Sequence, residues 1–134
     1  MSNNDGWVGI DLDGTLAVYD KWRGADHIGR PVHKMVRRVI QWHREGKKVK
    51  IFTARVSSNN PSRDISRKAI EKWAKEHLGF VPEITAEKDY MCLEIWDDRC
   101  VQVVSNLGIP IVESMKELRE KYEQFKEDVE EAGK

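Results

Sequence analysis

The chain has 134 residues, of which 40% are hydrophobic and 34% are charged. This length and composition are typical of one folded domain, and they exclude two independent cores, a disordered chain and a membrane-spanning segment. The net charge is zero, but residues 1–67 have six more basic than acidic residues, and residues 68–134 have the opposite excess. The neutral total argues against a protein that coats nucleic acid, while the basic half leaves room for a local basic patch.

The first residues and the cysteines indicate a cellular compartment. The sequence Met-Ser-Asn-Asn-Asp-Gly has neither the basic region nor the apolar stretch of a secretory signal. Cys92 and Cys100 are therefore expected to be reduced thiols. We expect a cytoplasmic protein that does not contact a membrane.

Short apolar runs alternate with helical patterns along the chain, which predicts a mostly parallel sheet in a three-layer, doubly wound (Rossmann-like) α/β fold. In such folds ligands bind beyond the carboxyl ends of the strands. In chain order the expected elements are a strand at residues 7–10, a helix from 32 to a stop at Gly46, a strand at 49–52, a helix from the N-cap Asn60 to Gly79, strands at 82–85 and 92–96, a helix at 101–107, a strand at 109–112, and a last helix that starts with the capping box Ser114–Glu117.

We expect a single domain over residues 1–134, with a core over about 7–112 and a C-terminal helix with an acidic tail over 113–134. Two alternatives remain open for the apolar stripe of this last helix. It packs on the sheet of a monomer, or it pairs two subunits of a homodimer. The stripe consists of Leu118, Tyr122, Phe125 and Val129.

Two carboxylates, Asp11 and Asp13, directly follow the first expected strand in the run Asp-Leu-Asp-Gly-Thr. Carboxylates in such a place are costly unless a hard cation such as Mg²⁺ compensates them. Gly14 permits a tight turn whose backbone N–H groups can donate to phosphate oxygens, so Gly14 and Thr15 are candidate substrate-binding residues. A plain turn or a calcium loop is the alternative, but the further ligands of a calcium loop are missing at the required spacing.

Later strand ends add further polar groups. Thr53 and Arg55 follow the second strand, Lys88 precedes the fourth strand, and Asp97 and Asp98 follow it. Because the carboxyl ends of parallel strands meet at one edge of a sheet, these groups are expected to lie together. Phosphoryl transfer needs such a set, since its catalysis consists mainly of positioning and of cations that absorb charge.

In this order the Asp-Leu-Asp-Gly-Thr run, Thr53, Lys88 and the Asp97-Asp98 pair resemble the four motifs of the haloacid-dehalogenase-like (HAD) phosphohydrolases, over roughly residues 7–112. The resemblance implies a HAD-like fold and a two-step hydrolysis of a phosphomonoester. Asp11 would attack phosphorus and form an aspartyl-phosphate. Asp13 would protonate the leaving oxygen and then take a proton from water.

The same resemblance implies the remaining roles. Thr53 and Lys88 would hold phosphoryl oxygens. Mg²⁺ would be bound by the Asp11 carboxylate, the Asp13 main-chain carbonyl and an acidic residue of the last motif. Of the two candidates in that motif, Asp98 is favoured over Asp97.

The spacing of the motifs leaves no room for a full cap domain, so an open site and a bulky substrate are expected. The long segment 17–31 contains Trp22 and Arg23, which suit stacking on a base and contact with phosphate. A loop that covers its own small core is the alternative. Arg55 is a further substrate-binding candidate.

The last motif, with residues 101–104, is similar to the phosphatase domain of bacteriophage polynucleotide kinases. The leading expectation is a nucleotide or polynucleotide phosphate end as substrate. The alternatives are a phosphoprotein or small-metabolite phosphatase and a non-catalytic phosphate-binding HAD-like module. A receiver domain that is phosphorylated on aspartate is the least favoured, because its acidic pair follows the first strand.

Overall fold

The computed structural model describes residues 5–133 of the chain. These residues form two compact units, and the boundary between the units lies between Asp98 and Arg99. The expected core extends to residue 112, so its last part, residues 99–112, belongs to the second unit.

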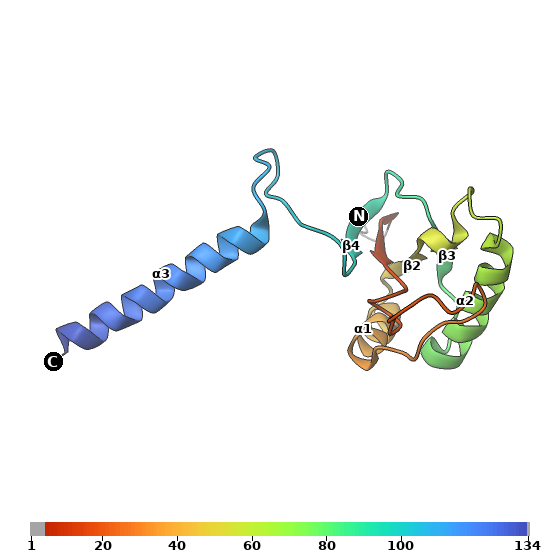
Figure 1. Cartoon of the computed structure of the whole chain (residues 1–134), viewed down its shortest axis with the longest axis horizontal. Coiled ribbons are helices and arrows are strands. Elements are labelled where there is room, and N and C mark those ends of the chain that lie inside the picture. Colours follow the sequence, from red (N-terminus) through yellow and green to blue (C-terminus); the bar gives the residue numbers. More distant parts are fainter. Residues whose placement is uncertain (1–4, 134) are drawn as a thin grey trace. The chain divides into compact units, whose positions relative to one another are not determined.

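The first unit is built on a four-stranded sheet in which every neighbouring pair is parallel (Figure 1). The expected α/β fold with a parallel sheet is therefore present. The strands lie in the order β3-β2-β1-β4. The chain adds β2 and β3 on one side of β1 and then β4 on its other side, so the strand order reverses at β1. Such a reversal is where open parallel sheets bind ligands. The strands are β1 (Trp7–Ile10), β2 (Lys48–Phe52), β3 (Glu83–Thr85) and β4 (Cys92–Trp96).

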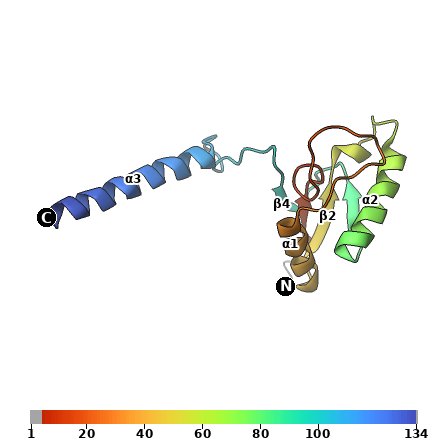
Figure 2. The same cartoon turned by 60° about the horizontal axis from the view of Figure 1, so that its bottom comes forward.

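Two helices, α1 (His33–Arg44) and α2 (Arg63–Leu78), cover one face of this sheet (Figure 2). Strand side chains of that face pack with both helices in one core, because alternate strand residues point to the same side. Its buried members include Val8, Ile10, Val49, Ile51 and Ile84 from the strands, and Val36, Val39, Ile70 and Trp73 from the helices.

The expected third layer is not formed in the first unit. The connection from β3 to β4, residues 86–91, contains no helix. A helical crossover between parallel strands takes about a dozen residues or more, so this connection is too short for one. The first unit therefore has a sheet and one helical layer, where the sequence predicts helices on both faces.

The sheet face away from the helices carries a buried lysine. The Lys50 ammonium forms ion pairs with Glu83 and, at 3.7 Å, with Asp89. The indole Nε1 of Trp7 donates to Asp89 Oδ1 at 2.8 Å, and the ammonium lies 4.6 Å from the Trp7 ring centroid. We call Trp7, Lys50, Glu83 and Asp89 the lysine cluster. The ammonium attracts both carboxylates, and the cluster joins β1, β2 and β3 to the 86–91 connection.

The ends of α2 show one correct and one incorrect expectation. The helix ends at Gly79, whose φ of +84° is left-handed and favours glycine, as predicted. Its N-cap is Ser62, not Asn60. The Asn60 side chain instead accepts from Ser62 N at 3.0 Å and donates to Arg55 O at 2.6 Å. Asn60 thus shapes the turn before the helix, because Pro61 and Ser62 are still part of that turn.

The second unit begins with an irregular segment and ends with the long helix α3 (Ile111–Ala132). Val103 and Pro110 form an isolated antiparallel bridge around a turn with left-handed backbone at Asn106 (φ +67°) and Gly108 (φ +70°). The expected helix at 101–107 and strand at 109–112 are therefore wrong, because these left-handed residues reverse the chain.

The expected start of the last helix is also wrong, because α3 starts at Ile111 and the Ser114–Glu117 capping box lies inside it. In the described part of the chain, no helix is both long and apolar enough to cross a membrane. Cys92 and Cys100 form no disulfide.

Candidate functional site

Three carboxylates converge at the carboxyl ends of β1 and β4. Asp11 directly follows β1, and Asp97 and Asp98 directly follow β4. One oxygen of each carboxylate lies within 4.8 Å of the oxygens from the other two. The backbone fixes this approach, because Asp11 N donates to Trp96 O at 2.8 Å and so extends the pairing of the two strands. We call Asp11, Asp97 and Asp98 the acidic cluster. The motif resemblance names Asp11 and one of the other two, with Asp98 favoured over Asp97, as side-chain metal ligands.

The environment of Asp11 opposes its negative charge. Burial of the carboxyl group raises its pKa to about 7, and the nearby Asp97 and Asp98 carboxylates contribute to the same shift. A cation bound among these oxygens would remove that opposition. Carboxylate oxygens are the ligands that a hard cation such as Mg²⁺ takes, so the residues present fit this metal.

Gly14 and Thr15 hold one member of the acidic cluster in place. Thr15 Oγ1 accepts from Asp98 N at 3.0 Å and donates to Asp98 Oδ1 at 3.3 Å. Gly14 has a φ of +90°, and a Cβ atom there would lie 2.5 Å from Asp98 Oδ2. Glycine is therefore required both by the backbone and by the close approach of the carboxylate. The sequence predicts substrate contacts for Gly14 and Thr15, and the contacts seen in the structure position Asp98.

Asp13 lies outside the acidic cluster and forms an ion pair with Arg55. Arg55 Nε and Nη2 each donate to one Asp13 carboxylate oxygen at 2.8 Å. Both side chains are largely shielded, with 22% of Asp13 and 7% of Arg55 exposed. Arg55 Nη1 also donates to Ala25 O at 3.3 Å, and the guanidinium lies 4.8 Å from the Trp22 ring centroid. Arg55, expected to bind substrate, therefore holds Asp13 in this conformation.

Sequence reasoning missed this pair, although it named both residues. They are 42 positions apart, and no local pattern indicates their contact. Thr53, at the end of β2, helps to place the arginine. Its buried Oγ1 accepts from Arg55 N at 3.2 Å and caps the short 3₁₀ helix η2 (Ala54–Val56). The structure thus brings Thr53 to the carboxyl edge of the sheet, as predicted, with its oxygen used by the backbone.

Two predicted site residues, Lys88 and Arg23, have their described contacts with residues outside the acidic cluster. Lys88 is exposed on the 86–91 connection. Burial raises the pKa of the Cys92 thiol, and the nearby Lys88 charge opposes this shift. Cys92 pairs with Trp7 at the amino end of β1, about 13 Å along the strand from Asp11. Arg23 forms an exposed ion pair with Asp20 at 2.7 Å.

The segment 17–31, expected to replace a cap, is tied to the rest of the unit at several points. Figure 2 shows it passing from the end of β1 to α2 before the chain enters α1. Val18 N donates to Arg30 O at 2.8 Å and closes its base. Ser66 Oγ donates to Ala25 O and Trp73 Nε1 to Gly29 O, both at 2.9 Å. This segment is an anchored loop, and Trp22 protrudes from it with 55% of its surface exposed.

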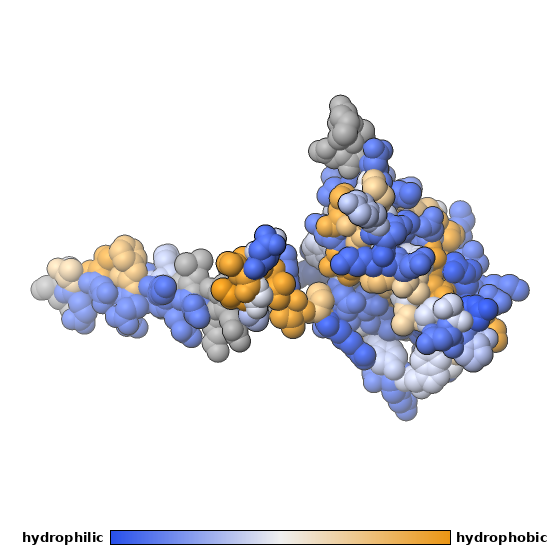
Figure 3. Space-filling view, turned by 90° about the horizontal axis from the view of Figure 1, so that it is seen from above, coloured by the Kyte–Doolittle hydropathy of each residue, from blue (hydrophilic) through white to orange (hydrophobic). Residues whose placement is uncertain are grey.

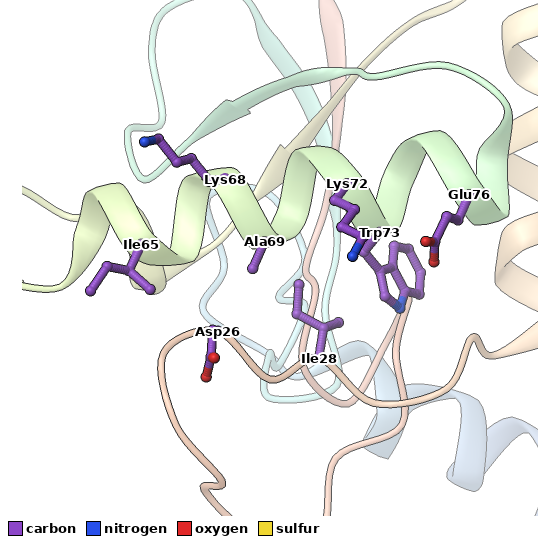
Figure 4. Close-up of a pocket in the computed structure, with 8 residues that line it drawn as sticks. All are labelled: Asp26, Ile28, Ile65, Lys68, Ala69, Lys72, Trp73 and Glu76. Carbon is purple, nitrogen blue, oxygen red and sulfur yellow. The ribbon is translucent and has the colours of Figure 1, made fainter.

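A pocket of about 550 Å³ lies between this loop and α2 (Figure 4). Ile28 from the loop and Trp73 from the helix face the same space, which has an apolar floor and charged rims. No member of the acidic cluster lines it, so it is a separate cavity. The lining residues are Asp26, Ile28, Ile65, Lys68, Ala69, Lys72, Trp73 and Glu76.

Comparisons with known proteins give no relative from which a function could be transferred. No protein-family model matches the chain, and neither a curated protein nor a solved structure matches it. The assignment of the site therefore depends on the geometry and chemistry of the chain's own residues.

Proposed function

We propose that the chain is a Mg²⁺-dependent phosphomonoester hydrolase in which Asp11 is the nucleophile. One observation carries this proposal: Asp11, Asp97 and Asp98 converge at the point where the strand order of a parallel sheet reverses. The order of the motifs, which resembles that of the HAD phosphohydrolases, supports the same assignment. The burial of Asp11 and the nearby carboxylates, which together raise its pKa, are costly for folding. Groups with perturbed pKa values are concentrated at functional sites.

In the proposed reaction an Asp11 carboxylate oxygen attacks phosphorus, and the bond from phosphorus to the leaving oxygen breaks. Water then attacks the aspartyl-phosphate, which releases inorganic phosphate and restores the carboxylate. Asp11, Asp97 and Asp98 hold the metal, and Mg²⁺ supplies the positive charge that offsets the phosphate and the carboxylates. Thr15 and Gly14 keep Asp98 in place during both steps.

Proton transfer is assigned to Asp13. It gives a proton to the leaving oxygen and takes one from the attacking water. Because Arg55 engages both Asp13 oxygens, this role requires the ion pair to open when substrate binds. The released guanidinium is then available for a phosphoryl oxygen, which is a strong bidentate partner of arginine.

A nucleotide or polynucleotide phosphate end is the proposed substrate. The exposed Trp22 ring sits on the Arg55 guanidinium, which holds Asp13, so an aromatic platform lies close to the proposed proton donor. Base stacking on such a ring is tolerant of sequence. Exposed basic residues on and near α1 provide positive charge for a phosphate backbone, and they are Lys34, Arg37, Arg44 and Lys48.

A metal-binding module without hydrolysis is the second candidate. It is favoured by the closed Asp13–Arg55 pair and by the position of Lys88. In the structure, neither Asp13 nor Lys88 is placed for the role that the resemblance implies. Such a module would bind Mg²⁺ at the acidic cluster and leave a phosphomonoester intact.

The test compares hydrolysis of an aryl phosphate with Mg²⁺ and with a chelator, and measures Mg²⁺ binding by calorimetry. We expect activity that needs Mg²⁺ and falls at least about a thousandfold in Asp11→Asn. Asp64→Asn, an exposed carboxylate in the first turn of α2, is the matched control and should behave as wild type. Binding of Mg²⁺ without hydrolysis of any phosphomonoester would favour the second candidate, and the absence of both would overturn the proposal.

The substrate class is tested with a nucleoside monophosphate, a 3′-phosphorylated oligonucleotide and a phosphoserine peptide. Trp22→Ala should raise KM for the two nucleotide substrates about tenfold, which is the size of one stacking contact, and leave the aryl phosphate unchanged. Equal losses on all substrates would show that Trp22 only packs on Arg55.

A further inference from the structure

The helix α3 carries an uninterrupted heptad pattern of apolar residues. The start of the helix at Ile111, earlier than the sequence predicts, extends the pattern beyond the two heptads that are evident from Leu118 onward. Alternating steps of four and three residues place every member at an a or d position of a coiled coil. The members in sequence order are Ile111, Met115, Leu118, Tyr122, Phe125, Val129 and Ala132.

The three large apolar side chains in the C-terminal half of this stripe are exposed, and Ile111 at its start is partly buried. Tyr122, Phe125 and Val129 are 59%, 63% and 55% exposed. Figure 3 shows hydrophobic residues gathered on one side of the C-terminal part of α3 and hydrophilic residues on the other. A helix of 22 residues is about 33 Å long, and an isolated helix gains too little from its backbone bonds to be stable in water. The stripe therefore needs a surface that covers it.

We propose that this surface is the same stripe of a second copy, and that the two α3 helices pair antiparallel. Charge complementarity beside the stripe supports this orientation. Lys121 and Asp128 occupy equivalent flanking positions, each directly before a core residue, Tyr122 or Val129. In the register that places Tyr122 opposite the partner's Phe125, Lys121 lies opposite the partner's Asp128. Symmetry makes this attractive pair occur twice.

A parallel pair is disfavoured by the same charges. It would place Lys121 opposite the partner's Lys126 on both sides, which is repulsive. In the antiparallel pair Lys126 approaches the partner's Arg119, but the two Lys121–Asp128 attractions oppose this repulsion, and the parallel pair has no such attraction. Lys126 also has an acidic neighbour on its own helix, which screens it in either orientation. Its ammonium lies 3.2 Å from Glu123 and 5.3 Å from the centroid of the Tyr122 ring.

The area of the stripe is adequate for a dimer. In the proposed register Tyr122 and Phe125 of both copies form the two central layers. An aromatic side chain buries about 150–250 Å² in total, so the exposed parts of these four rings together supply about 500 Å². Four further layers, from the outer a and d positions, bring the interface toward the roughly 1,200 Å² of a specific complex.

The first test measures the oligomeric state of the full chain by sedimentation equilibrium. We expect a dimer for wild type and a monomer for Phe125→Glu, because this substitution puts a charge into a central layer. Circular dichroism on Phe125→Glu confirms that the chain is folded. Hydrolysis is assayed separately, because the dimer does not depend on the proposed function.

The second test addresses the orientation. Asp128→Lys should raise the dimer Kd about tenfold, because two attractive pairs become repulsive. The double substitution Lys121→Glu with Asp128→Lys should restore wild-type affinity. Glu127→Lys, on the outer face of the helix, changes the net charge equally and is the control. A wild-type monomer, or a dimer unaffected by Phe125→Glu, would overturn the proposal. Equal effects of Asp128→Lys and Glu127→Lys would overturn the antiparallel arrangement.

Discussion

The acidic cluster and the lysine cluster are two groups of charged residues on one sheet, and they differ in how their charges are balanced. In the lysine cluster a buried ammonium is paired with two carboxylates, and one of them, Asp89, also accepts from the Trp7 indole N–H. In the acidic cluster three carboxylates approach one another within 4.8 Å. Folding alone explains the first arrangement, because its partners lower the cost of burying Lys50. The second works against folding, which supports the metal site proposed above.

The pKa shifts express the same difference. The hydrogen bond and ion pair to Glu83 raise the pKa of Lys50, and the Trp7 indole lowers the pKa of Asp89. Lys50 and Asp89 are thus both stabilised in their charged forms. Burial and like charges raise the pKa of Asp11 to about 7, so the charged form is disfavoured there. The comparison predicts that substitutions in the acidic cluster change ligand binding, and that those in the lysine cluster change stability.

The largest effect is expected for Asp98→Asn. We expect Mg²⁺ affinity to fall about a hundredfold, because a carboxylate ligand is lost while the hydrogen bonds to Thr15 keep the side chain in place. Calorimetry with Mg²⁺ measures the affinity directly. The free energy of unfolding without metal should stay within about 0.5 kcal/mol of wild type, because one repulsive charge is removed from an exposed position. An unchanged Mg²⁺ affinity would remove Asp98 from the metal site.

Lys50→Met should have the opposite profile. The substitution keeps an apolar stem in the sheet but removes the charge that faces Glu83 and Asp89. We expect a loss of about 1–2 kcal/mol in the free energy of unfolding, because both carboxylates are more than half exposed and regain water. Urea unfolding measures this loss. Mg²⁺ affinity should not change, and Lys48→Met, at an exposed position of the same strand, is the control.

The difference between the two clusters also explains what the sequence reveals. Asp11, Asp97 and Asp98 could be found because each directly follows an apolar run, and parallel strands end at a common edge. The lysine cluster could not be found, since the partners of Lys50 are far from it in the sequence, on β3 and on an irregular connection. The alternation in β2 makes Lys50 resemble a solvent-facing residue of an ordinary strand.

The fold shows the same limit. The four strands follow from short apolar runs, although no residue of β4 is buried, and the ends of α1 and α2 follow from glycines. The absence of a helix between β3 and β4 could be predicted only by counting the residues available for a crossover. The 101–110 segment has helical apolar spacing, and two left-handed residues, Asn106 and Gly108, override it. Contacts between distant positions, such as Asp13 with Arg55, have no local signal in one sequence.

The two clusters should also respond to pH in opposite directions when metal is absent. The Asp11 pKa is about 7 in the folded chain and 3.8 in the unfolded chain, so the folded chain binds more protons between these values. Its contribution to stability is present below pH 4 and is lost as pH rises toward 7, by about 1–2 kcal/mol for a half-buried group that solvent screens. The lowered pKa of Asp89 acts the other way, because its contribution is present above pH 4 and is lost in acid.

Urea unfolding between pH 4 and pH 8 in the presence of a chelator measures this behaviour, with the flanking pH values chosen to bracket the Asp11 pKa of about 7. Asp11→Asn should remove the loss of stability between pH 4 and 7, because the amide does not titrate. Saturating Mg²⁺ should have the same effect in wild type, because a bound cation favours the carboxylate. A wild-type profile that is flat in the chelator would show that burial and the neighbouring carboxylates do not raise the Asp11 pKa in solution.

The smallest effect is expected for Lys88→Ala, and it separates the structure from the motif resemblance most sharply. The resemblance implies that Lys88 binds a phosphoryl oxygen, whereas in the structure its charge acts on Cys92 at the amino end of the sheet. We expect kcat/KM on the aryl phosphate to change less than about twofold, because the charge of an exposed lysine is screened by solvent and salt. Arg55→Lys in the same assay should lose at least about tenfold, since lysine cannot form the bidentate contact with a phosphoryl group that is proposed for the guanidinium released from Asp13. A loss in Lys88→Ala as large as that in Arg55→Lys would mean that the 86–91 connection moves toward the acidic cluster when substrate binds, and the lysine cluster would then be part of the site, because Asp89 belongs to the same connection.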